Sequence, residues 1–342
     1  MRFLDAAWKK LSVSATRMPA PVVALLAVGL ALAAHSFSGA IAGEPRRIGY
    51  LTLDSAEVAA PFAAAFRNGL AEGGFVEGRN TTIDWRFAAY NANVLSALAS
   101  ELIASGAELL VADGTQAALA AKGATGAIPI VAAASGDLVG AGVVTSLARP
   151  GGNITGMTLI SAGLAGKRLA LLKEMAPRTD TVAVLFNPDN PSSVIQLREA
   201  QAAAPKLGLK VQAVPIQRQA DIDRIVPSLA GRVNAMLICD DFVLDAFRAR
   251  IGSHALRGRI PWICSYAMPE DKICLMWYRP DLQDVYARAG RLAARILTGS
   301  KPGDLLVQQP TKFVLGINAS TASALGISVP QSLLLTADEI IR

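Results

Sequence analysis

The sequence predicts an α/β protein in which two lobes, each built on a parallel sheet, are joined by a hinge. Three observations support this class: the length of 342 residues, an alternation of strand-like and helix-like segments that occurs twice, and the stretch LARPGGNITGMT at 147–158 between the two halves. A chain of this length exceeds one ordinary core. Because Pro150 restricts φ and Gly151 and Gly152 permit positive φ, we interpret the stretch as the approach to a first crossing between lobes. The alternative is a surface turn within one large sheet.

The first half of the chain has the pattern of strands that alternate with helices. Phe62, Phe66 and Leu70 recur at helical spacing before Gly73, whereas residues 80–88 alternate as an edge strand does. The expected strands are 47–53, 80–88, 108–112, 128–134 and 154–160, and the expected helices are 61–72, 94–104 and 115–123. This order implies right-handed crossovers and a parallel sheet covered by helices on both faces.

The second half repeats the scheme. Its expected strands are 181–186, 210–216, 234–239, 260–266 and 273–278, and its expected helices are 164–175, 191–207, 221–229, 243–256 and 282–297. We expect the last two of these strands to close the sheet and the helix 282–297 to return to the first lobe. The predicted lobes therefore comprise 45–158 with 280–309, and 161–278. Residues 310–342, with a strand at 313–318 and a helix at 321–325, are assigned to neither lobe.

The N-terminal residues have the pattern of an export signal. Four basic residues precede or flank the start of an apolar run at 20–34, and Ala40-Ile41-Ala42 follows as a small-residue cleavage site. This pattern predicts a signal peptide at 1–42, cleaved near Ala42, and a soluble exported protein. An uncleaved anchor is the alternative. Loss of 1–42 removes four basic groups and one acidic group, which lowers the formal net charge from +6 to +3. No clustered basic stripe remains, so nucleic acid is not a predicted partner.

The cysteines and the histidine predict no metal site and leave open whether one disulfide forms. Export permits disulfides, and Cys264 could pair with Cys274 if their segments form adjacent strands, although separate buried thiols are the alternative. Cys239 lies in an apolar run and is expected in the core. The chain beyond residue 42 has one histidine, His254, and no C-x-x-C pair. Neither a metal nor a cofactor is predicted.

Catalytic motifs are absent from the sequence. It has no G-x-S-x-G elbow, no P-loop, and no G-x-G-x-x-G after the first strand. The single histidine of the exported part has no evident nucleophile partner. We therefore predict a protein that binds a ligand and is not an enzyme.

The candidate ligand site follows from the topology of open parallel sheets, which bind ligands at the carboxyl ends of their strands. The predicted ligand-binding residues are Thr52, Asp54, Ser55, Gly114, Thr115, Gln116, Ser135, Asp137, Asn187, Asn190, Asp240, Tyr266 and Tyr278. The polar residues before helices could instead be N-caps, each worth about 1 kcal/mol. Asp240 and Asp241 could either meet a cationic ligand group or start a helix. Tyr266, Trp277 and Tyr278 could stack on a ligand or pack in the core.

Several motifs carry a family resemblance over nearly the whole chain from Arg46 to Arg342. These are SLARPGGNITGMT, GKRLALLKEMAP, VAVLFNPDNP and the tail KPGDLLVQQPTKFVLGINASTASALGISVPQSLLLTADEII. They resemble the ABC transporter substrate-binding protein family that includes tryptophan-type binding proteins. The resemblance implies a type I periplasmic-binding fold, with two Rossmann-like lobes, a three-segment hinge and a ligand in the cleft. It also implies delivery of a small molecule, such as an aromatic amino acid, to a membrane permease and ATPase.

The chain matches the family motifs unevenly. Asn187-Pro188-Asp189-Asn190-Pro191 matches the lobe-two loop, whereas Leu138 stands where the family's Gly-Asp-Pro has proline. The family's Gly-Leu-Met-Ser-Tyr-Gly is CLMWYR at 274–279, so Trp277 replaces a small residue and Arg279 replaces a glycine. Bulk and charge at these positions would change the shape of the cleft or the freedom of the hinge. Of the properties that the resemblance implies for this chain, the identity of the ligand is therefore the least transferable.

The resulting hypothesis is a monomeric solute-binding protein that works by hinge closure. Thr115, Ser135 and Asp137 would hold a polar end of the ligand, with Asp137 suited to an amine or hydroxyl and Asp240 assisting from lobe two. Tyr266 and Tyr278 would flank the apolar part. The alternatives are a ligand-sensing subunit of a membrane receptor and a secreted enzyme on a two-lobed scaffold.

Overall fold

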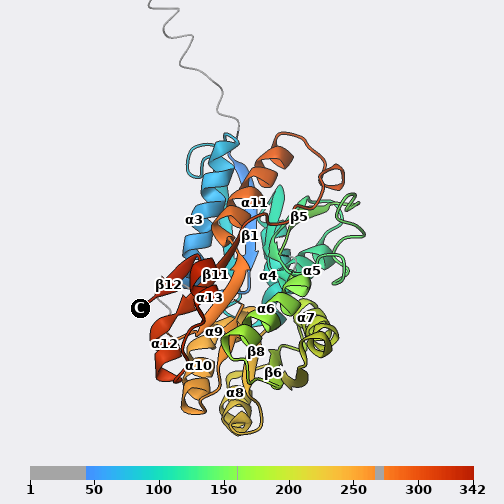
Figure 1. Ribbon diagram of the computed structural model, residues 1–342. Helices are drawn as coiled ribbons and strands as arrows, with labels where there is room; N and C mark the ends of the chain where they lie inside the picture. Colours follow the sequence, from blue (N-terminus) through green and yellow to red (C-terminus); the bar gives the residue numbers. More distant parts are fainter. Residues whose placement is uncertain (1–43, 160, 266–272) are drawn as a thin grey trace, which may run out of the picture. The chain divides into compact units, whose positions relative to one another are not determined.

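The computed structural model describes residues 44–159, 161–265 and 273–342, whose strands form two sheets (Figure 1). The first sheet is parallel throughout and has the order β2-β1-β3-β4-β5. Its strands are β1 (Arg46–Thr52), β2 (Thr81–Phe87), β3 (Leu109–Asp113), β4 (Ile130–Ser135) and β5 (Ile154–Thr158). The helices of this part are α3 (Ala56–Glu72), η2 (Ala92–Val94), α4 (Leu95–Ala104), α5 (Thr115–Ala124) and α11 (Leu282–Leu297). Strand 80–88 thus lies at a sheet edge, as predicted.

Two apolar clusters cover the two faces of the first sheet. One contains residues of α3 and α11, and the other contains residues of α4 and α5. Helices α3 and α11 lie side by side in Figure 1 and approach closely at glycines. A Cβ atom on Gly69 would lie 1.8 Å from the carbonyl oxygen of Ala287, and one on Gly290 would lie 2.2 Å from that of Phe66. The helix 282–297 therefore packs on the first sheet, as predicted.

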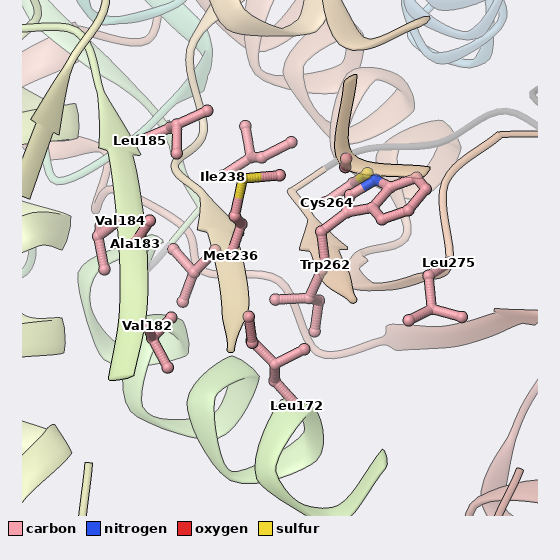
Figure 2. Packing of buried hydrophobic residues seen from close by; sticks show 14 of the residues in the cluster. Leu172, Val182, Ala183, Val184, Leu185, Met236, Ile238, Trp262, Cys264 and Leu275 are labelled. Atoms are coloured by element: carbon pink, nitrogen blue, oxygen red, sulfur yellow. The ribbon is translucent and has the colours of Figure 1, made fainter. Parts of the chain in front are cut away.

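The second sheet has seven strands in the order β12-β11-β10-β9-β8-β6-β7. They are β6 (Thr181–Phe186), β7 (Lys210–Pro215), β8 (Ala235–Ile238), β9 (Trp262–Cys264), β10 (Met276–Pro280), β11 (Phe313–Asn318) and β12 (Glu339–Ile341). The remaining helices are α6 (Ser161–Met175), α7 (Pro191–Ala203), η3 (Ala204–Leu207), α8 (Gln219–Ile225), η4 (Val226–Leu229), α9 (Phe242–Ala246), α10 (Arg248–Arg257), η5 (Pro302–Asp304), α12 (Ala319–Ala324) and α13 (Gln331–Thr336). Figure 2 shows the centre of this core, where Leu172 of α6 packs beneath the side chains of β6 and β8.

The structure corrects the expectation that the strand 273–278 closes the second sheet. Strand β11 pairs with β10 in antiparallel orientation, and β12 pairs with β11, so the sheet extends by two strands. The antiparallel pair arises because the chain leaves for α11 after β10 and re-enters the sheet from the opposite end. Residues 313–341 therefore belong to the second sheet. The exact lobe boundaries at 45–158, 161–278 and 280–309 stay a prediction.

Two helices differ from their expected bounds. Helix α3 begins at Ala56 instead of Pro61, because the Ser55 hydroxyl accepts a hydrogen bond from the amide of Val58 and caps a turn ahead of the proline, which lies inside the helix. The single helix expected at 243–256 is divided at Phe247 into α9 and α10. Continuous apolar periodicity does not reveal such a break, because the residues on both sides still face one core.

The predicted signal peptide lies outside the described residues. Among the residues that are described, no helix has the length and apolarity that a membrane span requires.

The pairing of Cys264 with Cys274 is formed in the structure, with Cα atoms 6.4 Å apart. The two residues lie at the end of β9 and just before β10, which are neighbouring parallel strands. Cys239 is the remaining, buried thiol. Burial in an apolar core raises the pKa of Cys239, so it is expected to be unreactive.

Reduction of this disulfide is expected to lower the free energy of unfolding by about 2–3 kcal/mol, because the bond restricts a short loop of the unfolded chain. Urea denaturation with and without dithiothreitol measures the change. The double variant Cys264→Ser/Cys274→Ser is the control and should show the reduced stability in both conditions. Equal stability of the oxidised and reduced wild-type protein would contradict the prediction.

Candidate functional site

A pocket of about 830 Å³, part of it open to solvent, lies where the carboxyl ends of strands from both sheets meet. Asp54 follows β1, Gly114 follows β3 and Gly136 follows β4 on the first sheet, while Asp240 and Asp241 follow β8 on the second. The polar lining residues are Asp54, Tyr90, Thr115, Asn190, Ser192, Gln196, Asp240, Asp241, Asp245, Arg248, Ser265 and Arg279. A concave site with an apolar wall and a few polar side chains is the usual form of a small-molecule site.

The first sheet places two buried carboxyl groups near the pocket, Asp54 in its lining and Asp113 next to the lining residue Gly114. Asp113 accepts hydrogen bonds from the hydroxyls of Tyr286 at 2.7 Å and Thr52 at 3.1 Å. Burial raises the pKa of Asp113 to about 6 although these hydrogen bonds oppose the shift. Asp54 lines the pocket, and its burial together with the charge of Asp113 raises its pKa to about 8. The positive charge of Arg248 acts in the opposite direction on Asp54. Burial at this wall therefore disfavours the negative charge of both carboxyl groups in the empty protein.

Asp54 is expected to make the empty protein less stable as the pH rises from about 4 to 8. Across this range the folded chain retains a proton that the unfolded chain releases, so unfolding is favoured by increasing pH. Asp54→Asn cannot ionise and is expected to be more stable than wild type by an amount on the order of 5 kcal/mol at pH 8, and equally stable near pH 4. Urea denaturation at several pH values tests this. An unchanged slope of stability against pH in the variant would contradict it.

The second-sheet wall is built around Arg168, whose side chain has no exposed surface. Its guanidinium donates to both carboxylate oxygens of Asp240, at 2.9 and 3.1 Å, and to the carbonyl oxygen of Tyr278 at 2.9 Å. Asp240 thus has its charge balanced from behind, and 21% of its side chain remains exposed. The arrangement fixes a pocket residue to strand β10, which leads into the crossing to α11.

Asp241 begins helix α9. Its carboxylate accepts hydrogen bonds from the amides of Val243 and Leu244 and from the side chains of Asn187 and Asn190. Of the two roles considered for the pair, Asp241 therefore has that of starting a helix, while both carboxylates lie in the lining of the pocket and their contact with a ligand stays a prediction.

A further carboxyl group in the lining of the pocket is that of Asp245. It accepts a hydrogen bond from the Ser265 hydroxyl at 3.1 Å, and burial together with the charge of Asp240 raises its pKa. Arg248 donates to the backbone oxygen of Asp245 at 2.8 Å, and its charge acts on both Asp245 and Asp54. The positive charge of Arg248 is therefore shared between two carboxyl groups.

The apolar wall comes from helices. The rings of Phe62 in α3 and Tyr286 in α11 are stacked with centroids 4.8 Å apart. Val58, Leu159 and Leu282 complete this wall. Flat rings at one side of a polar pocket suit an apolar or aromatic ligand body.

The two walls contact each other directly. Thr115 and Ser192 share a hydrogen bond between hydroxyls at 2.9 Å, and Gln116 donates to the carbonyl oxygen of Asp189 at 3.3 Å. The ring of Phe242 packs on Gly114, where a Cβ atom would lie 2.2 Å from the ring. The structure therefore has the pocket in a closed arrangement.

The structure brings Asp54, Gly114, Thr115, Asn190 and Asp240 of the predicted ligand-binding residues to the pocket. Ser135 is buried beside it, between lining residues Ala134 and Gly136. Tyr266 lies outside the described residues.

Other predicted residues act within the fold instead of lining the pocket. Thr52 bonds to Asp113, Asn187 bonds to Asp241, and Ser55 caps α3. The carboxylate of Asp137 accepts from the amides of Val139 and Gly140 in its own turn. Tyr278 stacks on Phe313 at 5.8 Å. Gln116 contacts the opposite wall and does not line the pocket.

Sequence reasoning missed several lining residues. Phe62, Tyr286, Asp245 and Arg248 lie on helices, and a rule based on strand ends does not select them. A signal was available for Phe62 and Tyr286, because both belong to apolar helix faces that point toward the first sheet. Within the described ranges, no group of three His, Cys, Asp or Glu side chains is placed to hold a metal ion.

The fold and the pocket together define a two-lobed solute-binding protein of the type I periplasmic class. The chain belongs to the ABC transporter substrate binding protein family, whose model matches residues 60–341. Proteins of this family bind small ligands and work with an ABC transporter outside the cytoplasm.

Three relatives show the extent of the similarity. A tyrosine-binding protein of Clostridioides difficile strain R20291 is 28% identical over 260 residues, which are 76% of this chain and 75% of that protein. The crystal structure of an ABC domain from Streptococcus pneumonia in complex with L-Trp is 28% identical, with a TM-score of 0.79 over 86% of this chain and all of that one. A ligand-free, open substrate-binding protein with adhesive properties from Clostridium difficile is 26% identical, with a TM-score of 0.65 over 87% of this chain and 99% of that one.

Proposed function

We propose that this protein captures a small solute that carries an amine and an apolar or aromatic body, and delivers it to an ABC importer. The observation that carries the proposal is a pocket between two sheets that combines buried carboxyl groups with stacked rings. Asp54 and Asp245 would meet the amine, because a positive ligand group relieves the cost of burying their negative charge. Phe62 and Tyr286 would contact the apolar body.

Two observations support a mechanism in which the two lobes close around the ligand. At nearly equal identity, the TM-score is higher with the L-Trp complex than with the open, ligand-free protein. The Thr115–Ser192 hydrogen bond and the packing of Phe242 on Gly114 join the two walls, and an open form would separate them. A ligand increases the closed population only by its higher affinity for that form.

The site and the family also suggest which ligands to test, and what oligomeric state and location to expect. The bound solutes named for two relatives, tyrosine and L-Trp, make aromatic amino acids the first compounds to examine. We extend the proposal to a monomer in the periplasm, with residues 1–42 removed as a signal peptide.

A thermal-shift screen with L-tryptophan, L-tyrosine and L-phenylalanine tests the function. A compound present at a hundred times its Kd adds about 2.7 kcal/mol of stability, which raises the melting temperature. Asp54→Asn is expected to weaken binding roughly 10- to 100-fold, whereas Asp304→Asn, which removes an exposed carboxylate away from the pocket, leaves it unchanged. Equal affinities of Asp54→Asn and wild type would contradict the role given to Asp54.

A further inference from the structure

Two neighbouring residues at the edge of the pocket have a backbone conformation that glycine usually adopts. Among the described residues, three that are not glycine have φ in the left-handed region: Ala89 at 46°, Tyr90 at 65° and Arg259 at 51°. Arg259 lies just beyond the end of helix α10, where a left-handed residue is common. Ala89 and Tyr90 do not follow a helix. They form the turn between β2 and η2, and their conformation is strained for residues that have a side chain.

This turn is held against the end of strand β1. The amide of Tyr90 donates to the carbonyl oxygen of Leu53 at 2.7 Å, and the amide of Ala89 donates to the carbonyl oxygen of Asp54 at 3.4 Å. The turn therefore places Tyr90 beside the segment that carries Asp54. Asp54 and Tyr90 both line the pocket, whereas Ala89 is exposed and does not line it.

The backbone of the turn does not require a tyrosine. Glycine adopts a positive φ without strain, and asparagine adopts it more readily than a bulky residue does. The ring of Tyr90 packs in part against the apolar cluster of α4 and α5, and the same residue lines the pocket. Strained residues concentrate at ligand sites, where the surrounding structure holds a side chain in a position that the ligand requires. A contact between this ring and the ligand would account for the strain.

We infer that Tyr90 contacts the ligand, and that its ring lies beside the amine that Asp54 binds. The inference rests on the proposed function and deepens it, because it adds an aromatic ring to the amine subsite. A protonated amine is attracted to the face of an aromatic ring as well as to a carboxylate. Asp54 supplies the charge of this subsite and Tyr90 supplies the ring, while Phe62 and Tyr286 contact the apolar body of the ligand.

Isothermal titration with matched compounds tests the inference. L-tryptophan, L-tyrosine and L-phenylalanine are compared with indolepropionate, hydroxyphenylpropionate and phenylpropionate, each of which lacks only the amine. Tyr90→Asn removes the ring but tolerates the left-handed backbone. It is expected to weaken binding of the amino acids roughly 3- to 30-fold and to change binding of the propionates less than about twofold. Tyr90→Phe retains the ring and is expected to bind all the compounds as wild type does.

The control is Ala89→Gly. It relaxes the same turn and removes only an exposed methyl group, so it is expected to raise the melting temperature by about 2 °C and to leave all affinities unchanged. A melting temperature that does not rise would remove the argument from strain and overturn the inference.

The binding data separate the inference from the proposed function. If Tyr90→Asn weakens amino acids and propionates equally, or changes neither, the inference is overturned while the proposed function stands. Where a propionate does not bind to wild type, the loss of affinity for its amino acid decides alone. If the wild-type protein binds none of the three amino acids, both are overturned.

Discussion

Replacing Arg168 by methionine is expected to lower the free energy of unfolding by about 3–5 kcal/mol. The substitution retains most of the apolar volume of the side chain but leaves Asp240 without its counter-charge and the carbonyl oxygen of Tyr278 without its donor. Breaking a buried ion pair from one side has this cost because the remaining charge is poorly solvated. Urea denaturation of the variant and of wild type measures the difference.

A double-mutant cycle with Asp240→Asn provides the control for Arg168. The two residues are in direct contact, so the double variant is expected to lose less stability than the sum of the two single variants. Additive losses would show that the pair contributes no interaction energy, and would remove the argument that Arg168 ties the pocket wall to β10.

Gly69→Ala is the second substitution with a large expected effect, a loss of about 3 kcal/mol. The new methyl group would lie 1.8 Å from the carbonyl oxygen of Ala287, and a backbone atom cannot move aside as a flexible side chain can. Helix α11 would have to shift away from α3, which would loosen the apolar cluster between them. Thermal and urea denaturation measure the loss.

Gly123→Ala in helix α5 is the matched control for Gly69→Ala. No atom lies within 4 Å of a Cβ built there, so the higher helix propensity of alanine is expected to stabilise the protein by about 0.5 kcal/mol. Effects of the same sign and size in both variants would contradict the steric argument.

Most strands and helices could be predicted from the sequence, because the apolar residues of each recur with the period of a strand or a helix and the segment is bounded by glycine, proline or a capping residue. Residues 181–186 are an example, since the expected strand and β6 coincide. Strand β11 also coincides with the strand expected at 313–318, but its place in the second sheet and the existence of β12 could not be predicted in the same way. Strand β12 has only three residues, and its place depends on β11, which arrives after the chain has left the sheet.

The location of the pocket could be predicted from the sequence, but the direction of several side chains at that location could not. The position of a residue at the end of a parallel strand follows from topology, which is why Asp54, Gly114 and Asp240 lie at the pocket. The partner of each polar group does not follow from topology. Asp137 and Tyr278 lie in the expected segments, but a local turn and a ring contact take up their side chains.

The contact between α3 and α11 also determines when the chain can fold. Helix α3 follows the first strand, whereas its partner comes after most of the second sheet in the sequence (Figure 1). A growing chain can assemble β1 to β5 and α3. The sheet face on which α3 and α11 pack remains partly exposed until residue 297 has been added. Contacts between such distant segments make folding slow. We therefore expect a truncated chain that ends before Leu282 to expose the apolar face of α3, and the first sheet to complete its folding only after most of the second sheet has been synthesised.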